Sequence, residues 1–428
     1  MTFGSPGSGG SVEHQPTWYP APERVAAAHR VAAAFGQAYR RDPDGVWAAP
    51  GRVNVIGEHL DYNGGHCLAF ALPHRTFVAL AVRPDGVVSV RSAQAPRSDS
   101  PSWQGRLDEI APGTVPGWAG YVAGVAWALR AEGFDVPGFD AYVDGHVPLG
   151  SGLSSSAALS CSVAVALDGA ARLGLGADDG GRARLAAACM SAENVIAQAP
   201  TGGLDQTASL RCASGRALRI DCVTFAVEQV PFDLAAAGLE LLVTDTRARH
   251  AHAHGGYGAR RSQCEDAAAR LGVGYLAQIT PDGLDAAMAT LALLTEAGTD
   301  PGMLGRRARH VVSESARVAQ VVRLVRSGDL RSVGAILDAS HASLRDDFEV
   351  SSDELDLVCE AGGRAGALGS RMIGGGFGGS CISLVERDQV AAVASAVLEA
   401  FAVAGLVEPV FLRAVPDGPA GPVRHPWT

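Results

Sequence analysis

The segment from Val147 to Leu167 constrains this chain most, because it carries no charged side chain over 21 residues. A helix of that length is long enough to cross a bilayer. Six serines and two glycines interrupt its apolar residues, however, and they argue against a membrane span. Gly150 and Gly152 give access to positive φ angles and to close approach of the backbone. We therefore expect a loop that leads into a helix beginning at Ser155.

This loop and helix carry groups that can hold an anion. Ser154–Ser156 open a helix whose first N–H groups lack intrahelical partners and whose dipole favours negative charge. All 35 basic residues of the chain are arginine, so a P-loop lysine and a Schiff-base lysine are both excluded. A phosphate here would be held by backbone N–H groups, hydroxyls and a metal ion. A capped helix after a flexible loop is the alternative, since one serine suffices as a cap.

A second polar cluster lies in Gly51–Gly65, where an apolar strand leads into a loop. Within five positions this loop carries Glu58, His59, Asp61 and Tyr62. Carboxylates accept hydrogen bonds and an imidazole donates or accepts them, so the set can hold several hydroxyl groups at once. The pattern is typical of a sugar site. A solvated turn is the alternative, because charged loops are common.

A third segment, Gly374–Gly379, contains five glycines in six residues. Glycine at this density loses conformational entropy on folding and packs no side chain. It therefore indicates backbone that approaches a ligand or another segment closely. A tight, bulged hairpin is the alternative.

Two carboxylates form a fourth candidate feature. Glu193 lies on an expected helix that Pro200 ends, and Asp205 follows the break at 201–204. One carboxylate suits a Mg²⁺ ligand and the other a base, because Mg²⁺ is usually held by few carboxylates together with phosphate oxygens. Ordinary surface charge is the alternative for either residue.

Composition excludes several classes of protein. With 428 residues, 47% hydrophobic and 19% charged, the chain has material for a large core and is neither disordered nor a small disulfide scaffold. A net charge of −10 argues against a dedicated nucleic-acid partner. The eight cysteines form no Cys-x-x-Cys pair and indicate buried thiols in a reducing compartment. With no secretory signal recognised, we expect a cytoplasmic protein without a membrane partner.

Helical and strand patterns are mixed in both halves without strict alternation, which favours an α+β protein of two domains. Helices are expected over about 22–39, 118–130, 155–173, 182–198, 258–271, 304–327, 330–343, 353–366 and 388–403. Strands are expected over 53–56, 67–72, 76–82, 87–90, 139–143, 241–245 and 409–413, with a further pair around the glycine run.

These segments together resemble those of galactokinases, members of the GHMP superfamily of small-molecule kinases. Gly51–Gly65 is similar to the galactokinase signature, Val147–Leu159 to the phosphate loop of the superfamily, and Gly374–Gly379 to its third motif. Supporting matches are Gly202–Gln206, Tyr257 with Arg260–Cys264, and Ser340–Glu349. The resemblance extends over about residues 20–415.

The resemblance implies the two-domain GHMP kinase fold, of class α+β. It implies an N-terminal domain like domain 2 of ribosomal protein S5 over 20–200 and a C-terminal GHMP domain over 201–405. Before these domains, the Gly- and Ser-rich composition predicts a flexible tail over 1–19. The site would lie in the cleft between the two domains. The last strand, about 406–416, is expected to return to the first domain.

The same resemblance implies roles for individual residues. Asp205 matches the catalytic aspartate, which either removes the proton of the sugar's C1 hydroxyl early or mainly orients that hydroxyl, and Arg52 matches the arginine beside it. Sugar contacts are implied for Glu58, His59, Leu60, Asp61, Gly202 and Tyr257. ATP contacts are implied for Ser92 and for Gly150, Ser151, Gly152, Leu153, Ser154, Ser155 and Ser156. Ser156 and Glu193 match ligands of Mg²⁺. For the adenine, Trp103, Trp118 and Tyr121 are candidates, although packing in an aromatic core is the favoured interpretation of each.

The implied reaction is the ATP-dependent phosphorylation of the C1 hydroxyl of α-D-galactose by a monomeric enzyme. Leu60 replaces the usual threonine and Gly203-Leu204 the common Ile-Met, which leaves the sugar open, because kinases of N-acetylgalactosamine, arabinose and galacturonate belong to the same family. A sensor that binds galactose and ATP without turnover is a further alternative, and the intact segment 154–158 argues against it. A mevalonate or homoserine kinase is disfavoured by the hydroxyl-binding loop.

Overall fold

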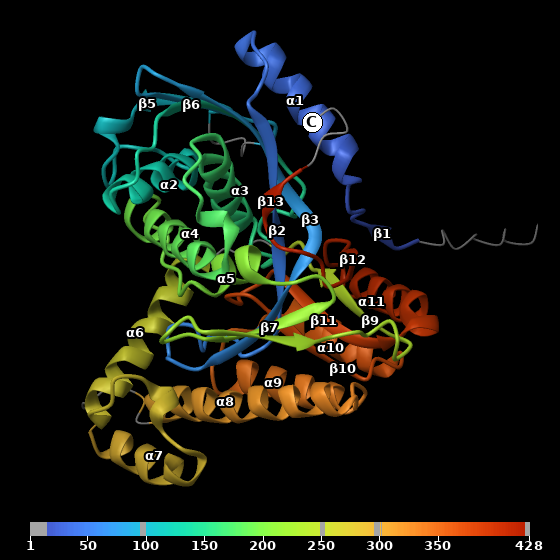
Figure 1. The fold of residues 1–428 in the computed structure, drawn as a ribbon. Helices are drawn as coiled ribbons and strands as arrows, with labels where there is room; N and C mark the ends of the chain where they lie inside the picture. The colour runs from blue at the N-terminus through green and yellow to red at the C-terminus, as the bar shows by residue number, and fades with distance from the viewer. Residues whose placement is uncertain (1–14, 95–99, 249–252, 295–299, 301, 424–428) are drawn as a thin grey trace, which may run out of the picture.

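The computed structural model describes residues 15–94, 100–248, 253–294, 300 and 302–423. Two sheets, one of eight strands and one of five, organise two halves of the chain. The blue and green first half lies above the yellow to red second half (Figure 1). Both halves mix helices with strands, so the expected α+β class is confirmed. In the part of the chain that is described, no helix combines the length and the apolar character that a membrane span requires.

The eight-stranded sheet organises the first half. Its main path runs β13 (Gly421–Pro422), β2 (Gly45–Ile56), β3 (His66–Arg83), β6 (Gly138–Gly145), β4 (Val87–Ser92) and β5 (Ser102–Arg106). β7 (Arg216–Asp221) pairs with β3 and with β8 (Val227–Pro231). Helices α2 (Ala119–Ala131), α3 (Ser155–Ala170), α4 (Asp179–Ser191) and α5 (Leu204–Arg211) lie on the opposite side from α1 (Arg24–Tyr39) (Figure 1).

Alternation along β2 explains why both faces of this sheet are covered. Val46 and Ala48 pack in the cluster that contains α1, whereas Trp47 and Ala49 pack in the cluster formed with α2, α3 and α4. Successive side chains of a strand point to opposite faces, so an unbroken apolar run requires a layer on each side. β2 and β3 are buried over nearly their whole lengths.

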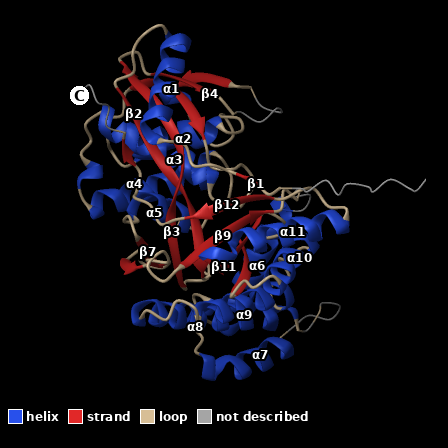
Figure 2. Cartoon of the chain, turned by 90° about the vertical axis from the view of Figure 1, so that its right-hand side faces the viewer, coloured by secondary structure: helices blue, strands red, loops and turns tan. Residues whose placement is uncertain are grey.

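The five-stranded sheet organises the second half, in the order β1 (Thr17–Trp18), β12 (Val410–Ala414), β9 (Leu239–Asp245), β11 (Ser380–Glu386) and β10 (Gly369–Ile373). Its helices are α6 (Ala253–Leu271), α7 (Leu284–Leu293), α8 (Met303–Ser327), α9 (Val333–Asp346), α10 (Asp353–Arg364) and α11 (Val390–Ala404). Figure 2 shows α8 and α9 below the sheet and α7 outermost. Short 3₁₀ turns cover 107–109, 175–177, 276–278, 281–283 and 387–389, and a π-helical turn covers 192–196.

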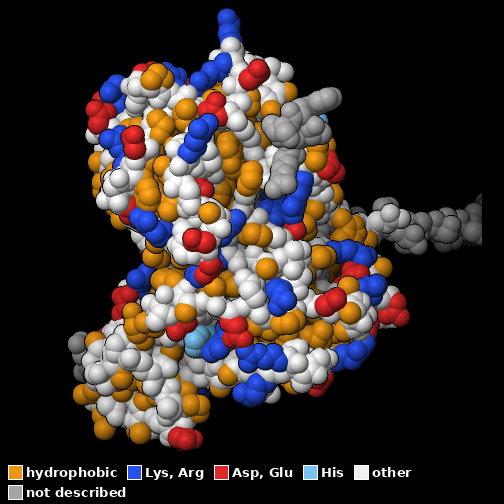
Figure 3. Space-filling view, viewed as in Figure 1, with side chains coloured by type: hydrophobic (Ala, Val, Ile, Leu, Met, Phe, Trp, Pro, Cys, Tyr) orange, Lys and Arg blue, Asp and Glu red, His pale blue; other side chains and the backbone are white. Residues whose placement is uncertain are grey.

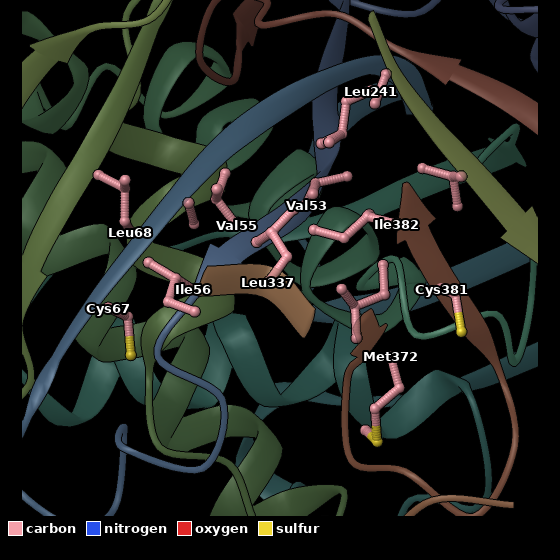
Figure 4. Packing of buried hydrophobic residues seen from close by; sticks show 14 of the residues in the cluster. Val53, Val55, Ile56, Cys67, Leu68, Leu241, Leu337, Met372, Cys381 and Ile382 are labelled. Carbon is pink, nitrogen blue, oxygen red and sulfur yellow. The ribbon is translucent and has the colours of Figure 1, made fainter. Parts of the chain in front are cut away.

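The two halves share one apolar cluster. Val53, Val55 and Ile56, at the end of β2, belong to the same buried cluster as Leu337 of α9 and Ile382 of β11. Figure 4 shows these side chains gathered between the strands. Burial of this apolar surface holds the polar loop after β2 against the second half.

Three expectations about organisation differ from the structure. The strand near the end of the chain, β12, does not return to the first half but lies between β1 and β9, where Phe411 is fully buried. The strand that returns is the short β13, which pairs with β2. β7 and β8 follow residue 200 yet belong to the eight-stranded sheet. Thr17–Trp18 pairs with β12, so this part of the expected tail is a strand, and residues 1–14 lie outside the described residues.

The distribution of charged side chains and the state of the cysteines can be compared with what the composition predicts. Basic and acidic side chains are interspersed with apolar ones over both halves of the face shown in Figure 3. All eight cysteines are free thiols, and all except the half-buried Cys359 are buried, which confirms the expected buried thiols.

Candidate active site

The predicted phosphate-binding loop, residues 150–156, folds as its glycines predict, but Ser154 is not a helix cap. Gly150, Gly152 and Ser154 adopt φ angles of 73°, 75° and 63°. Ser154 stands before the first residue of α3, yet its side chain makes no capping hydrogen bond. Its hydroxyl instead donates to Oδ2 of Asp205 over 2.5 Å. The simple capped-helix interpretation is therefore wrong.

Arg52 and Asp205 form the charged centre of the site. Arg52 Nε donates to Asp205 Oδ1 over 2.8 Å, and its Nη1 donates to the carbonyl of Gly152 over 2.5 Å. Burial opposes the charge on Arg52, but the carboxylates of Asp205 and Glu58 outweigh burial and raise its pKa. Asp205 lies in the first turn of α5, where the helix dipole stabilises negative charge. Charge-assisted bonds from two sides fix the direction of this carboxylate.

The loop after β2 presents its polar side chains to a cavity of about 220 Å³. Gly57 and His59 have φ angles of 102° and 62°, which turn the chain sharply at the end of the strand. His59 Nδ1 lies 2.9 Å from the hydroxyl of Tyr62, while its Nε2 is buried and has no hydrogen-bond partner among the described residues. Burial and the neighbouring Asp205 raise the pKa of Asp61 to about 7. This loop is therefore not a solvated turn.

The cavity brings together most of the residues for which a sugar contact was predicted. It is lined by Arg52, Glu58, His59, Asp61, Glu193, Pro200, Thr201, Leu204, Asp205, Tyr257, Gly374 and Gly375. In the segment 200–204 only Gly202 was predicted as a sugar contact, so the wall formed by Pro200, Thr201 and Leu204 was missed.

Two predicted sugar contacts lie outside this lining. Leu60 is fully buried in the shared apolar cluster, so it supports the loop from beneath and does not face the cavity. Gly202 packs against the carboxylate of Asp61, because a Cβ there would lie 2.3 Å from Asp61 Oδ2. Its role in this structure is to leave room for Asp61.

Glu193 lies where the cavity meets the start of α3. Ser156 Oγ donates to its Oε1 over 3.0 Å, and Gln206 Nε2 donates to its Oε2 over 2.6 Å. Burial and the charge of Asp205 raise its pKa to about 7. Among the described residues, no group of three or more His, Cys, Asp or Glu side chains is arranged to hold a metal ion alone.

A second cavity, of about 200 Å³, begins at Ser155 and Ser156. Its other lining residues are Thr76, Ser92, Gln94, Trp118, Tyr121, Val143, Gly145, Val147, Leu149 and Leu159. Trp118 and Tyr121 thus border open space, and Trp118 also packs against the core of the first half, as the favoured interpretation expects. Trp103 is not part of the lining and packs against the core of the first half. Because Ser156 also binds Glu193, the two cavities meet at the beginning of α3.

Two of the residues predicted to contact phosphate, Ser151 and Leu153, have buried side chains. Ser151 is buried and its hydroxyl donates to the carbonyl of Pro148 over 2.8 Å, and Leu153 is buried in the core. Neither side chain lines either cavity, so these two residues could contact a phosphate only through their backbone N–H groups.

The third glycine segment packs against the predicted phosphate-binding loop. It joins β10 to β11 as a hairpin, and Gly374 and Gly375 line the first cavity. A Cβ on Gly374 would lie 3.1 Å from the Cα of Gly152, and one on Gly376 would lie 2.3 Å from the carbonyl oxygen of Val350. Both interpretations of this segment are therefore correct: it is a hairpin, and its glycines allow close approach.

Family models match three parts of the chain. They describe a galactokinase galactose-binding signature (residues 33–82), the GHMP kinase N-terminal domain (120–212) and the GHMP kinase C-terminal region (321–403). The galactokinase of Streptomyces coelicolor is 47% identical over 92% of this chain and 98% of its own. The human galactokinase is 40% identical over 85% of this chain and 88% of its own.

Solved structures agree with these sequence relatives. The structure of Lactococcus lactis galactokinase complexed with galactose is 30% identical to this chain and matches it with a TM-score of 0.83. The match covers 92% of this chain and 98% of the Lactococcus lactis chain. The mevalonate kinase of Methanococcus jannaschii matches at 13% identity with a TM-score of 0.59, which shows the shared fold alone. By its site geometry, its motifs and its relatives, the chain belongs to the galactokinase family of GHMP kinases.

Proposed function

We propose that this chain transfers the γ-phosphoryl group of ATP to the C1 hydroxyl of α-D-galactose, giving galactose 1-phosphate and ADP. The observation that carries the proposal is the place of Asp205, held by Arg52 and Ser154 where the polar cavity meets the phosphate-binding loop. The match to galactokinases over nearly the whole chain supports the choice of sugar.

The polar cavity suits a sugar because it offers several directed partners. Glu58 and Asp61 supply carboxylate oxygens, and within the described part of the chain His59 Nε2 is buried without a hydrogen-bond partner. Leaving such a group unpaired is costly, and a sugar hydroxyl would satisfy it. Tyr257 closes the cavity from α6, and its ring lies 5.7 Å from that of His59.

Asp205 is assigned the role of base. A sugar hydroxyl in the cavity would replace Ser154 as the donor to its carboxylate, and the carboxylate would accept the C1 proton as the bond to phosphorus forms. Arg52 would hold the carboxylate in place and offset charge developing on the transferred group. Phosphoryl transfer needs little covalent chemistry from the protein, so these positions supply most of what is required.

The second cavity is assigned to the nucleotide. Trp118 and Tyr121 offer aromatic surface to the base, and Ser92 lines the same space. The loop over 150–156 leads from this cavity to Asp205, and its N–H groups together with the start of α3 suit the phosphates.

The residues present also fit Mg²⁺. Glu193 is a buried carboxylate whose pKa burial and Asp205 raise, so a nearby cation would relieve an unfavourable charge. We assign Ser156 and Glu193 as its protein ligands, a small set of the kind Mg²⁺ accepts when phosphate oxygens and water complete its shell. When bound, the ion neutralises charge on the β- and γ-phosphates. That the enzyme is a cytoplasmic monomer stays a prediction.

The test is a coupled assay of ADP release with Mg²⁺-ATP and a sugar panel: galactose, glucose, N-acetylgalactosamine, arabinose and galacturonate. We expect turnover that depends on galactose. Leu204, one of the two departures from the common family pattern at 203–204, lines the cavity, so a preference for N-acetylgalactosamine, arabinose or galacturonate would move the assignment to a sister kinase. Binding of galactose and ATP without ADP release would favour the sensor.

A further inference from the structure

A buried arginine lies directly beneath the polar cavity. Arg371 of β10 is 0% exposed and is among the largest fully buried side chains described. Its guanidinium forms an ion pair with Glu58, and Nη1 donates to the carbonyls of Asn54 over 3.2 Å and Val55 over 2.8 Å. It therefore binds both the end of β2 and the first acidic side chain of the loop that follows.

The ion pair lies at the boundary between the cavity and the apolar core. Glu58 is 4% exposed and lines the cavity, whereas the residue after Arg371, Met372, belongs to the shared apolar cluster with Val55 and Ile56 (Figure 4). Burial raises the pKa of Glu58, and the charges of Arg371 and Arg52 oppose that rise. Without Arg371, Glu58 would be a buried carboxylate without its closest counter-charge.

The backbone of the same loop is held from the same side. The N–H of Gly57 donates to Oε1 of Glu314 over 2.9 Å, and that oxygen also accepts from Ser340 over 2.9 Å. His310 Nε2 lies 3.1 Å from the carbonyl oxygen of Glu58. Because the backbone is held just before Glu58, at the N–H of Gly57, and at the carbonyl of Glu58 itself, the position of the Glu58 carboxylate depends on which group this side chain binds.

We propose that Arg371 is a positioning residue for the sugar: it fixes the direction of the Glu58 carboxylate and thereby sets how tightly, and through which hydroxyl, the sugar is bound. This inference rests on the proposed function, because it assigns Glu58 to a sugar hydroxyl. It extends that function to a side chain that lies outside the cavity lining and touches neither cavity.

The geometry separates the effect on sugar from an effect on ATP. Arg371 pairs with Ile382 in the β10–β11 ladder, so the backbone of β10 and the glycine segment after it are held by main-chain bonds. Replacing the Arg371 side chain removes bonds to Glu58 and β2 but leaves that ladder. The KM for the sugar should therefore change far more than the KM for ATP.

A second buried arginine provides a matched control. Arg75 of β3 is 2% exposed, pairs with the carboxylate of Asp417 and donates to the carbonyls of Gly418 and Pro419. Its partners are thus of the same kind, one carboxylate and two carbonyls, but they belong to the chain's last described segment. Arg75→Lys and Arg75→Met measure the effect of removing a buried guanidinium as such.

The experiment is a double-mutant cycle with Glu58→Gln, Arg371→Met and the double variant, assayed with galactose and with its 2-, 3-, 4- and 6-deoxy analogues. We expect Arg371→Met to raise the KM for galactose by about 10- to 100-fold, as for a displaced binding group, with the KM for ATP nearly unchanged. In the Glu58→Gln background the same change should have little effect. The deoxy analogue that abolishes the effect of Glu58→Gln should also abolish that of Arg371→Met.

The outcomes separate the two claims. No sugar-dependent ADP release by the wild type would remove the proposed function. If the wild type turns over, three results would each overturn the role of Arg371. The effects of Glu58→Gln and Arg371→Met could be additive, the two variants could respond to different deoxy analogues, or the Arg75 variants could show equal losses. Should Arg371→Met fail to fold, Arg371→Lys keeps the charge but not the fork of donors, and the same cycle decides.

Discussion

The two cavities of this protein meet at one helix end but are built in opposite ways. The cavity that we assign to the sugar is lined by carboxylates, an imidazole and an arginine, most of them contributed by short polar segments of the sequence. The nucleotide cavity is mostly apolar and aromatic, and its lining comes from β3, β4, α2, β6 and α3. A site made of contiguous polar residues can be recognised in a sequence, whereas a site made of scattered apolar residues shows the same sequence pattern as a hydrophobic core.

The largest effect is expected at the point where the two cavities meet. Asp205→Asn keeps the shape of the side chain but removes the proton acceptor, so kcat should fall by about 10²- to 10⁴-fold, with little change in either KM. Steady-state kinetics with galactose and ATP measure this. Asp282→Asn, in an exposed turn, is the control and should retain wild-type kcat. Retention of wild-type kcat by Asp205→Asn would remove Asp205 from the reaction.

The buried Glu314, which accepts a hydrogen bond from the N–H of Gly57, should make the stability of the fold sensitive to acid. Burial would raise the pKa of Glu314, but Arg317, His310 and Arg371 outweigh burial and lower it to about 2, below the 4.5 of an unfolded glutamate. The ionised group therefore stabilises the fold above pH 4.5, and this contribution, about 3 kcal/mol, is lost as the pH falls towards 2.

Urea unfolding of Glu314→Gln at pH 7, 5, 4 and 3 tests this. The variant should be less stable than the wild type at pH 7, and the difference should shrink as the pH falls, because the wild type loses its ionised group and the variant has none to lose. Glu265→Gln, at an exposed position, should follow the wild type. A difference that stays constant with pH would show that Glu314 contributes through packing alone.

Glu193 links the cavities and should control the demand for metal. Glu193→Gln retains a partner for Ser156 and removes the charge, so the Mg²⁺ concentration for half-maximal activity should rise by roughly 10-fold. Titration of Mg²⁺ at saturating galactose and ATP measures it. An unchanged Mg²⁺ requirement would count against Glu193 as a ligand.

The smallest effect is expected in the nucleotide cavity, where no single group carries the binding. Trp118→Leu should raise the KM for ATP by about 5- to 10-fold, the loss of one aromatic contact with a base, and leave the KM for galactose unchanged. Trp103→Leu is the matched control, because Trp103 lies in the same half and outside the lining. Equal effects of the two variants on the KM for ATP would show that Trp118 acts only through packing in the core.

Much of the fold was predictable wherever periodicity was long. The helices α1, α8 and α11 begin and end within a few residues of their predicted bounds. The short α5 was missed, although it carries Asp205, because eight residues hold too little periodic signal. β7 and β8 were missed for the same reason, although both belong to the eight-stranded sheet.

Local sequence alone specifies which chemical groups this protein carries: a helix start suited to an anion, a loop of side chains suited to hydroxyl groups, close-packing glycines and a pair of carboxylates. These are local properties, because spacing within one segment sets them. Tertiary structure decided which groups meet. Glu58 and Arg371 are 313 residues apart in the chain, and Ser154 and Asp205 are 51 apart. It also turned Leu60 inward and placed the half-buried Trp118 at the wall of a cavity, because burial depends on which distant surface packs against a residue, and no local pattern contains that partner.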